Sequence, residues 1–137
     1  MLKRLQQLGR SQHGQTLVEM AIILPLLILL LMATIEFGRI FFTYLSITNA
    51  TREAARSTVI SEQKDDAAIR QRVLDAASWL TAQNITVEVS PASVTNRTSG
   101  VPLTITVTYP VVLYTPVLSQ IISNPFTVSA QTTMRIE

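Results

Sequence analysis

The stretch HGQTLVEMAIILPLLILLLMATIEFG, from His13 to Gly38, decides the fold of this chain. Between Leu17 and Ile35 its one charged residue is Glu19, and almost every other side chain is apolar. As an α-helix these 19 residues would be about 28 Å long, which nearly equals the ~30 Å hydrocarbon thickness of a bilayer. We therefore predict a transmembrane segment at about residues 17–35, with a carboxylate at its start.

The residues before this segment predict its orientation. Lys3, Arg4 and Arg10 precede it, and no acidic residue does. Because positively charged flanks favour the cytoplasmic side, we expect residues 1–14 to form a cytoplasmic basic leader and the rest to be translocated. A cleaved secretory signal is the alternative. Its apolar region would be shorter, roughly 7–15 residues, and a small-residue cleavage site would follow it directly.

A helical pattern continues beyond the apolar run. Side chains at three- and four-residue spacing form one predicted apolar face, made of Phe37, Ile40, Phe41, Tyr44, Ile47, Thr48, Thr51, Ala55 and Thr58. The opposite side carries Arg39, Thr43, Ser46, Glu53 and Arg56. This pattern predicts one long helix over about residues 15–59. Pro25 is expected to kink it, because proline removes a backbone donor and clashes with the preceding turn.

The predicted long helix carries two groups of charged residues. Glu36 and Arg39 lie three residues apart at the predicted membrane-exit junction, so they can pair. We interpret them as an ordinary exposed pair that contributes roughly 0.2–0.5 kcal/mol. Arg52, Glu53 and Arg56 have the pattern of a solvated face, and contact with a neighbouring subunit is the alternative.

The remaining residues, 60–137, predict a small α+β head. Ser61, followed by three acids, marks the start of a second helix that runs to about Ala82. Its adjacent acids, Asp65 and Asp66, fit the positive end of the helix dipole better than a cation site. Alternating segments then predict three antiparallel strands at Ile85–Val89, Leu103–Tyr109 and Phe126–Ile136.

The connection between the last two strands is unusually apolar. Residues 116–123, PVLSQIIS, predict a short helix opened by Pro116 that packs on the sheet. The second helix and the distal half of the long helix are expected to cover the sheet's apolar face. The predicted fold class is therefore α+β and pilin-like, with a long N-terminal helix and a three-stranded head.

Composition limits the chemistry that this chain can perform. It contains no cysteine and one histidine, His13. Three of its eleven basic residues precede residue 14, so eight would remain against nine acidic residues after a cut there. A mature chain without histidine, cysteine or a positive charge excess predicts no catalytic residue, metal site or cofactor, and no nucleic-acid partner.

The start of the apolar run resembles the processing signal of type IV pilin-like proteins. A basic leader is followed by Gly14, four residues, Glu19 and an apolar helix. The resemblance implies that a prepilin peptidase cuts between Gly14 and Gln15 on the cytoplasmic side. In a filament, Glu19 could then neutralise the new amine on Gln15 of a neighbour. The alternative is a simple signal anchor in which Glu19 reaches to the membrane surface.

Gly14–Arg56 also resembles the TadE-like family, the minor pilins or pseudopilins of the tight-adherence branch of type IV pilus machinery. The shared features are Gly14-Gln15, Val18-Glu19, Pro25, Glu36-Phe37-Gly38-Arg39 and Arg52-Glu53-Ala54-Ala55-Arg56. Two positions depart from the pattern. Met20 stands where major pilins of this branch usually have tyrosine, which favours a minor subunit, and Ala54 replaces the usual glycine.

The resemblance implies a function in assembly rather than catalysis. We expect a subunit in a tight-adherence-type pilus, or at its base or tip, that supports pilus biogenesis, adhesion or secretion. Its implied partners are other major and minor pilins, the prepilin peptidase, the inner-membrane assembly platform and membrane lipid. The residues alone leave another hypothesis open, a single-pass membrane-anchored extracytoplasmic binding protein that does not polymerise.

Overall fold

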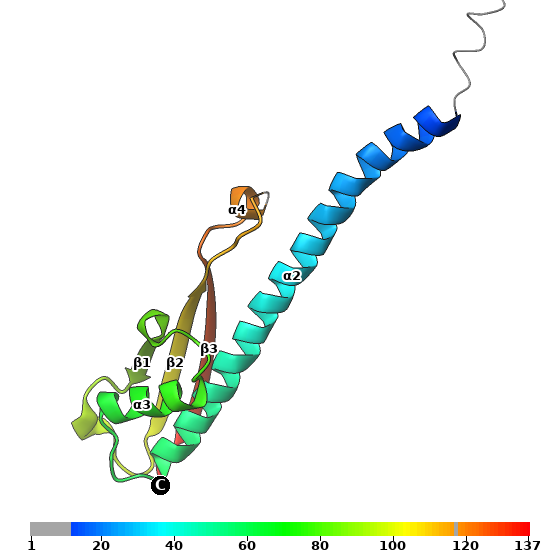
Figure 1. The fold of residues 1–137 in the computed structure, drawn as a ribbon. Helices are drawn as coiled ribbons and strands as arrows, with labels where there is room; N and C mark the ends of the chain where they lie inside the picture. The colour runs from blue at the N-terminus through cyan, green and yellow to red at the C-terminus, as the bar shows by residue number, and fades with distance from the viewer. Residues whose placement is uncertain (1–11, 117) are drawn as a thin grey trace, which may run out of the picture. The chain divides into compact units, whose positions relative to one another are not determined.

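The structure, a computed structural model, describes residues 12–116 and 118–137 (Figure 1). Most of the basic leader, including Lys3, Arg4 and Arg10, lies outside these residues. The helices are α2 (Gln12–Val59), α3 (Asp66–Ala76) and α4 (Leu118–Ile121), with 3-10 turns η1 (Ala82–Asn84) and η2 (Val94–Asn96). The strands are β1 (Thr86–Ser90), β2 (Pro102–Val111) and β3 (Phe126–Arg135). The predicted α+β class, with a long apolar N-terminal helix, is confirmed.

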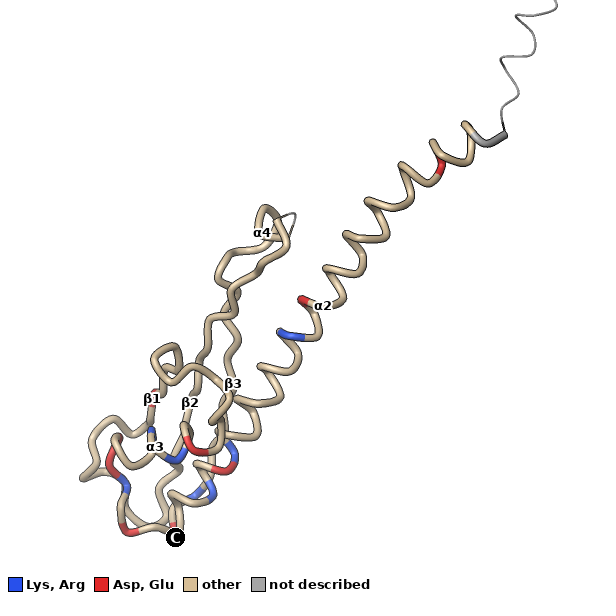
Figure 2. Tube along the Cα trace, viewed as in Figure 1, with Lys and Arg blue, Asp and Glu red and all other residues tan. Residues whose placement is uncertain are grey.

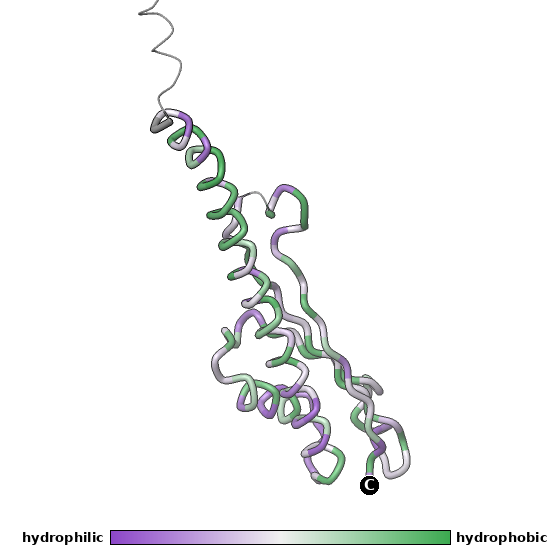
Figure 3. The backbone as a smooth tube through the Cα atoms, turned by 90° about the vertical axis from the view of Figure 1, so that its right-hand side faces the viewer, coloured by the Kyte–Doolittle hydropathy of each residue, from purple (hydrophilic) through white to green (hydrophobic). Residues whose placement is uncertain are grey.

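The chain divides into two compact units, and helix α2 contributes to both. The first ends at Ile35 and the second, which contains the whole head, begins at Glu36. The apolar part of α2 has a mean hydropathy of 2.6, and none of this stretch is buried within the structure. Figure 3 shows this part as almost uniformly hydrophobic. Helix α2 continues through Pro25 without interruption, and the kink there remains a prediction.

The predicted strands form one antiparallel sheet in the order β1-β2-β3. In its register Val107 of β2 lies opposite Val87 of β1 and Ala130 of β3. The inward face is buried at Leu103, Ile105, Val107, Val128, Ala130 and Ile136. Three further inward residues are partly buried against this core, namely Tyr109, Phe126 and Met134.

The buried face of the second half of α2 agrees only in part with the predicted one. Ile47, Thr51, Ala55 and Thr58 are buried as predicted. Phe37, Phe41 and Tyr44 were expected to face the core, but they are 69%, 52% and 45% exposed. Thr43 and Ser46, predicted for the opposite side, are buried instead. The other buried residues of this half are Glu36, Ala50, Ala54 and Val59, so most of the buried side chains are small. Small side chains allow the core to approach the helix backbone closely. Their hydroxyls donate to carbonyls one turn earlier, as in Ser46 to Phe42 at 2.6 Å and Thr58 to Ala54 at 2.6 Å, so burial leaves them satisfied.

Helix α3 is shorter than predicted at both ends. It begins after Asp65, whose side chain accepts from the backbone nitrogen of Ala68. The predicted start, Ser61, instead accepts from the backbone nitrogen of Gln63 at 3.1 Å and closes a turn. The helix ends at Ala76 rather than near Ala82. Beyond it, Arg70 donates to the carbonyls of Ala82 and Ile85 and so stabilises the segment that contains η1.

The apolar connection between β2 and β3 also differs from its prediction. Helix α4 forms within it, but the connection does not cover the sheet. Figure 1 shows α4 beyond the ends of β2 and β3. Ile121 is 76% exposed and Ile122 is 38% exposed. Polar contacts to Glu36 and Asn124, described below, determine the position of the connection. It therefore lies against those residues and not on the sheet face.

Candidate functional site

The N-terminal end of α2 carries the predicted processing and assembly residues. Gly14, Gln15 and Glu19 are exposed on the helix. Nε2 of Gln15 donates to Oε1 of Glu19 at 3.1 Å, because residues four apart lie on the same helix face. A nitrogen donor therefore occupies a place beside the Glu19 carboxylate. Cleavage between Gly14 and Gln15 remains a prediction.

The helix between Glu19 and Glu36 offers an apolar surface whose one hydroxyl, that of Thr34, donates to the carbonyl of Leu30 at 2.9 Å. Its large side chains are exposed, among them Leu17, Ile22, Leu26, Leu30 and Ile35. Figure 2 shows no charged residue along this stretch. An exposed apolar surface of this extent is typical of contact with a membrane or with other apolar helices. By its length and composition α2 fits a single-pass membrane anchor.

Glu36 is a buried carboxylate and not part of an ordinary exposed pair. The predicted pairing forms, since Nη1 of Arg39 lies 2.9 Å from Oε2 of Glu36. Glu36 itself is only 3% exposed. Its other oxygen accepts from the backbone nitrogens of Tyr114 and Thr115, the latter at 3.0 Å. The hydroxyl of Thr115 adds a longer contact at 3.4 Å.

These contacts determine the charge of Glu36. Burial raises its pKa, because it disfavours the charged form. The hydrogen bonds from Tyr114 and Thr115 and the positive charge of Arg39 outweigh burial, so the pKa lies below its ordinary value of 4.5. Glu36 is therefore ionised at neutral pH, and its charge is neutralised within the protein.

Arg39 and Asn124 make further contacts that hold the β2–β3 connection in place. Nη1 of Arg39 contacts the carbonyl of Val112 at 3.4 Å, and its guanidinium lies 4.4 Å from the centre of the Tyr114 ring. The side-chain amide of Asn124 pairs with both backbone groups of Leu113, each at 3.0 Å. Sequence reasoning missed these partners, although a lone Asn and Thr in an apolar loop were a weak signal for them.

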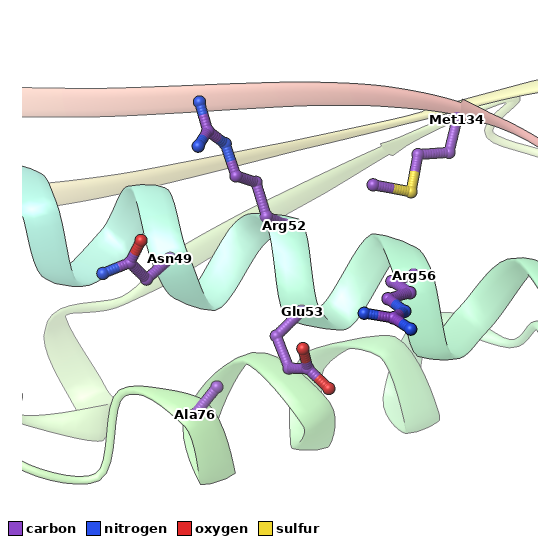
Figure 4. A pocket seen from close by; sticks show the side chains of 6 residues that line it. All are labelled: Asn49, Arg52, Glu53, Arg56, Ala76 and Met134. Carbon is purple, nitrogen blue, oxygen red and sulfur yellow. The ribbon is translucent and has the colours of Figure 1, made fainter.

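A second cluster lies on the distal half of α2. Arg52, Glu53 and Arg56 are exposed, in agreement with the solvated face predicted for them. With Asn49, Ala76 of α3 and Met134 of β3 they line a groove of about 450 Å3. Figure 4 shows Arg52 directed toward the strands and Glu53 toward α3. Contact of this face with a neighbouring subunit remains a prediction.

A buried arginine that the sequence did not reveal organises the loops of the head. The side chain of Arg97 is fully buried and pairs with Asp66. It also donates to the carbonyls of Lys64 at 2.6 Å and Pro91 at 2.8 Å. Asp65 and Asp66 thus have structural partners, the first as the cap of α3 and the second as the counter-charge of Arg97.

The comparisons with known proteins bear on helix α2. Residues 14–56 match the family model of TadE-like proteins. The match confirms the resemblance seen in the sequence, and it lies entirely within α2. No curated protein and no solved structure matches the chain.

The TadE-like segment, residues 14–56, contains Gln15, Glu19, Glu36 and Arg39. The match associates the chain with tight-adherence pili, and TadE-like proteins form a structural family rather than an enzyme family. The sheet, the Arg97 cluster and the β2–β3 connection lie outside the TadE-like segment.

Proposed function

We propose that this chain is a minor pilin or pseudopilin of a tight-adherence-type pilus. It assembles through its N-terminal helix into the filament, or at its base or tip, and supports pilus biogenesis, adhesion or secretion. The observation that carries the proposal is the Glu19 carboxylate beside the Gln15 side chain, at the start of an exposed apolar helix within the TadE-like segment.

The proposed chemistry is charge neutralisation in an apolar bundle. Cutting after Gly14 creates an α-amine on Gln15, one helical turn from Glu19. When apolar helices of several subunits pack together, an unpaired Glu19 carboxylate costs several kcal/mol. The amine of a neighbouring subunit removes that cost if it takes the position that the Gln15 amide nitrogen now occupies. This pairing is satisfied at one axial offset between subunits, so it sets their register.

The proposed topology divides the chain into three parts. Residues 1–14 are the cytoplasmic leader, residues 15–59 form the helix that spans the membrane at about 17–35, and residues 60–137 form the extracytoplasmic head. The partners are the prepilin peptidase, other major and minor pilins, the inner-membrane assembly platform and membrane lipid. The energy for assembly comes from an ATPase elsewhere in the machinery.

Intact-mass measurement of protein extracted from its native membrane tests the processing step. We expect a mass that lacks Met1–Gly14. A full-length chain would contradict the proposal and favour the alternative, a membrane-anchored binding protein that does not polymerise.

Substitution of the carboxylate tests the pairing step. Glu19→Ala should abolish or strongly reduce pilus formation while the protein remains in the membrane fraction. Glu62→Ala is the matched control, because it removes an exposed acid that lies outside the apolar stretch, the groove and the TadE-like segment. Normal pilus formation by Glu19→Ala would contradict the pairing.

A further inference from the structure

The connection between β2 and β3 ends in an apolar surface that the proposed assembly does not use. We call residues 112–124 the tip loop. Its sequence, VLYTPVLSQIISN, contains no charged residue. Val112, Tyr114, Ile121 and Ile122 are 49%, 71%, 76% and 38% exposed. In an extracytoplasmic head this surface would face water unless something covers it.

The contacts of the tip loop hold it to the residue that follows the apolar span. Glu36 directly follows Ile35, the last residue of the apolar span, and it accepts hydrogen bonds from Tyr114 and Thr115. A loop bonded to the first residue after a membrane span lies at the level of the bilayer surface. The covalent bond between Ile35 and Glu36 and the contacts within the head suffice to hold it at that level.

Several backbone groups of the tip loop have hydrogen-bond partners. Leu113 has both backbone groups paired with Asn124, and the nitrogens of Tyr114 and Thr115 are bonded to Glu36. The nitrogen of Ile122 donates to the carbonyl of Leu118 at 2.9 Å. Unpaired backbone groups are what normally prevents a loop from entering a region poor in water. These contacts reduce that cost.

We propose that the tip loop inserts Ile121 and Ile122 into the interfacial region of the bilayer, in the leaflet from which the chain's own span emerges. Apolar side chains enter the boundary between headgroups and acyl chains, while the amphipathic Tyr114 ring suits the headgroup level. The head thereby gains a second attachment to lipid besides its helix. The proposal rests on the membrane span of the proposed function and does not depend on filament assembly.

Lipid-specific quenching of tryptophan fluorescence tests this insertion on the full-length chain. Trp79, the one tryptophan, is first replaced by phenylalanine. Ile121→Trp then reports on the tip loop, and Val94→Trp is the matched control, because Val94 is 47% exposed in η2 of the same head. Both variants are reconstituted at low protein-to-lipid ratio into phosphatidylcholine vesicles with and without bromine on the upper acyl chain.

We expect brominated lipid to reduce the emission of the Ile121→Trp variant at least twofold and to leave the Val94→Trp variant nearly unchanged. Adding Ile122→Glu to the Ile121→Trp variant should restore most of that emission. Circular dichroism of each variant checks that the head is folded, which is expected because all three positions are exposed.

Three results would overturn the proposal. Equal, weak quenching of the Ile121→Trp and Val94→Trp variants, with the chain retained in the vesicles, would show a tip loop in water. Protection from aqueous acrylamide without quenching by brominated lipid would show a tip loop covered by protein, as in a subunit contact. Release of the chain from vesicles at alkaline pH would show that the chain does not span the bilayer. The membrane anchoring in the proposed function would then fail as well.

Discussion

Oε1 of Glu36 lies 3.0 Å from the backbone nitrogen of Thr115, although 79 residues separate them in sequence. The contact joins the residue that follows the apolar span to the loop between the last two strands. A buried carboxylate is stable only when hydrogen bonds and a counter-charge replace its hydration. Here Tyr114, Thr115 and Arg39 provide both.

Glu36→Gln should therefore destabilise the head by about 1–2 kcal/mol. The glutamine oxygen can still accept from the backbone nitrogens, but its amide group faces Arg39 and carries no charge to pair with it. Denaturant unfolding in detergent micelles measures the change, with Trp79 as the fluorescent reporter, since its ring lies 4.8 Å from that of Phe42. Glu88→Gln, at an exposed position of β1, is the control and should change stability little.

The lowered pKa of Glu36 predicts a specific pH dependence. Because the pKa of the folded protein lies below the ordinary value of 4.5, the ionised form stabilises the fold. This stabilisation is fully present above the ordinary value and is lost as the pH falls through the lower pKa of the folded state. The stability difference between the natural chain and Glu36→Gln should thus be constant near neutral pH and shrink in acid. A difference that grows on acidification would contradict the assignment.

Arg97→Lys should destabilise the head by about 3 kcal/mol. Lysine keeps the charge but lacks the planar fork that reaches the carbonyls of Lys64 and Pro91 together with Asp66. Arg56→Lys, which changes an exposed arginine, should stay within about 0.5 kcal/mol of the natural chain. Similar small losses for both variants would show that the Arg97 contacts contribute little.

The small-residue face of α2 predicts the effect of enlarging Ala54. Ala54 is fully buried, so Ala54→Leu should overpack the core and cost about 1–3 kcal/mol. Ala67→Leu adds the same atoms to an exposed position of α3 and should be nearly neutral. Unfolding midpoints of the two variants, measured side by side, test this difference. An unchanged midpoint for Ala54→Leu would mean that the helix and the core separate readily.

The features that depend on short stretches of sequence were predictable. An apolar run as long as a bilayer is thick indicates a span in any context, and alternation at Leu103, Ile105 and Val107 indicates a half-buried strand. The TadE-like motifs likewise lie in one continuous segment. The start of α3, by contrast, was predicted at Ser61, whereas Asp65 caps the helix and Ser61 closes a turn before it.

The sequence by itself determined the apolar span, the α+β class, the strands and the Gly14–Glu19 pattern, because each follows from spacing between near neighbours. Only the tertiary structure decided that Phe37 and Phe41 are exposed while Ser46 is buried, and that Glu36 fastens the tip loop. Burial depends on which distant segments approach a helix. The hydrogen bond between Glu36 and Thr115 could not be predicted from the spacing of residues in either segment. It depends on how the two distant segments are arranged in space.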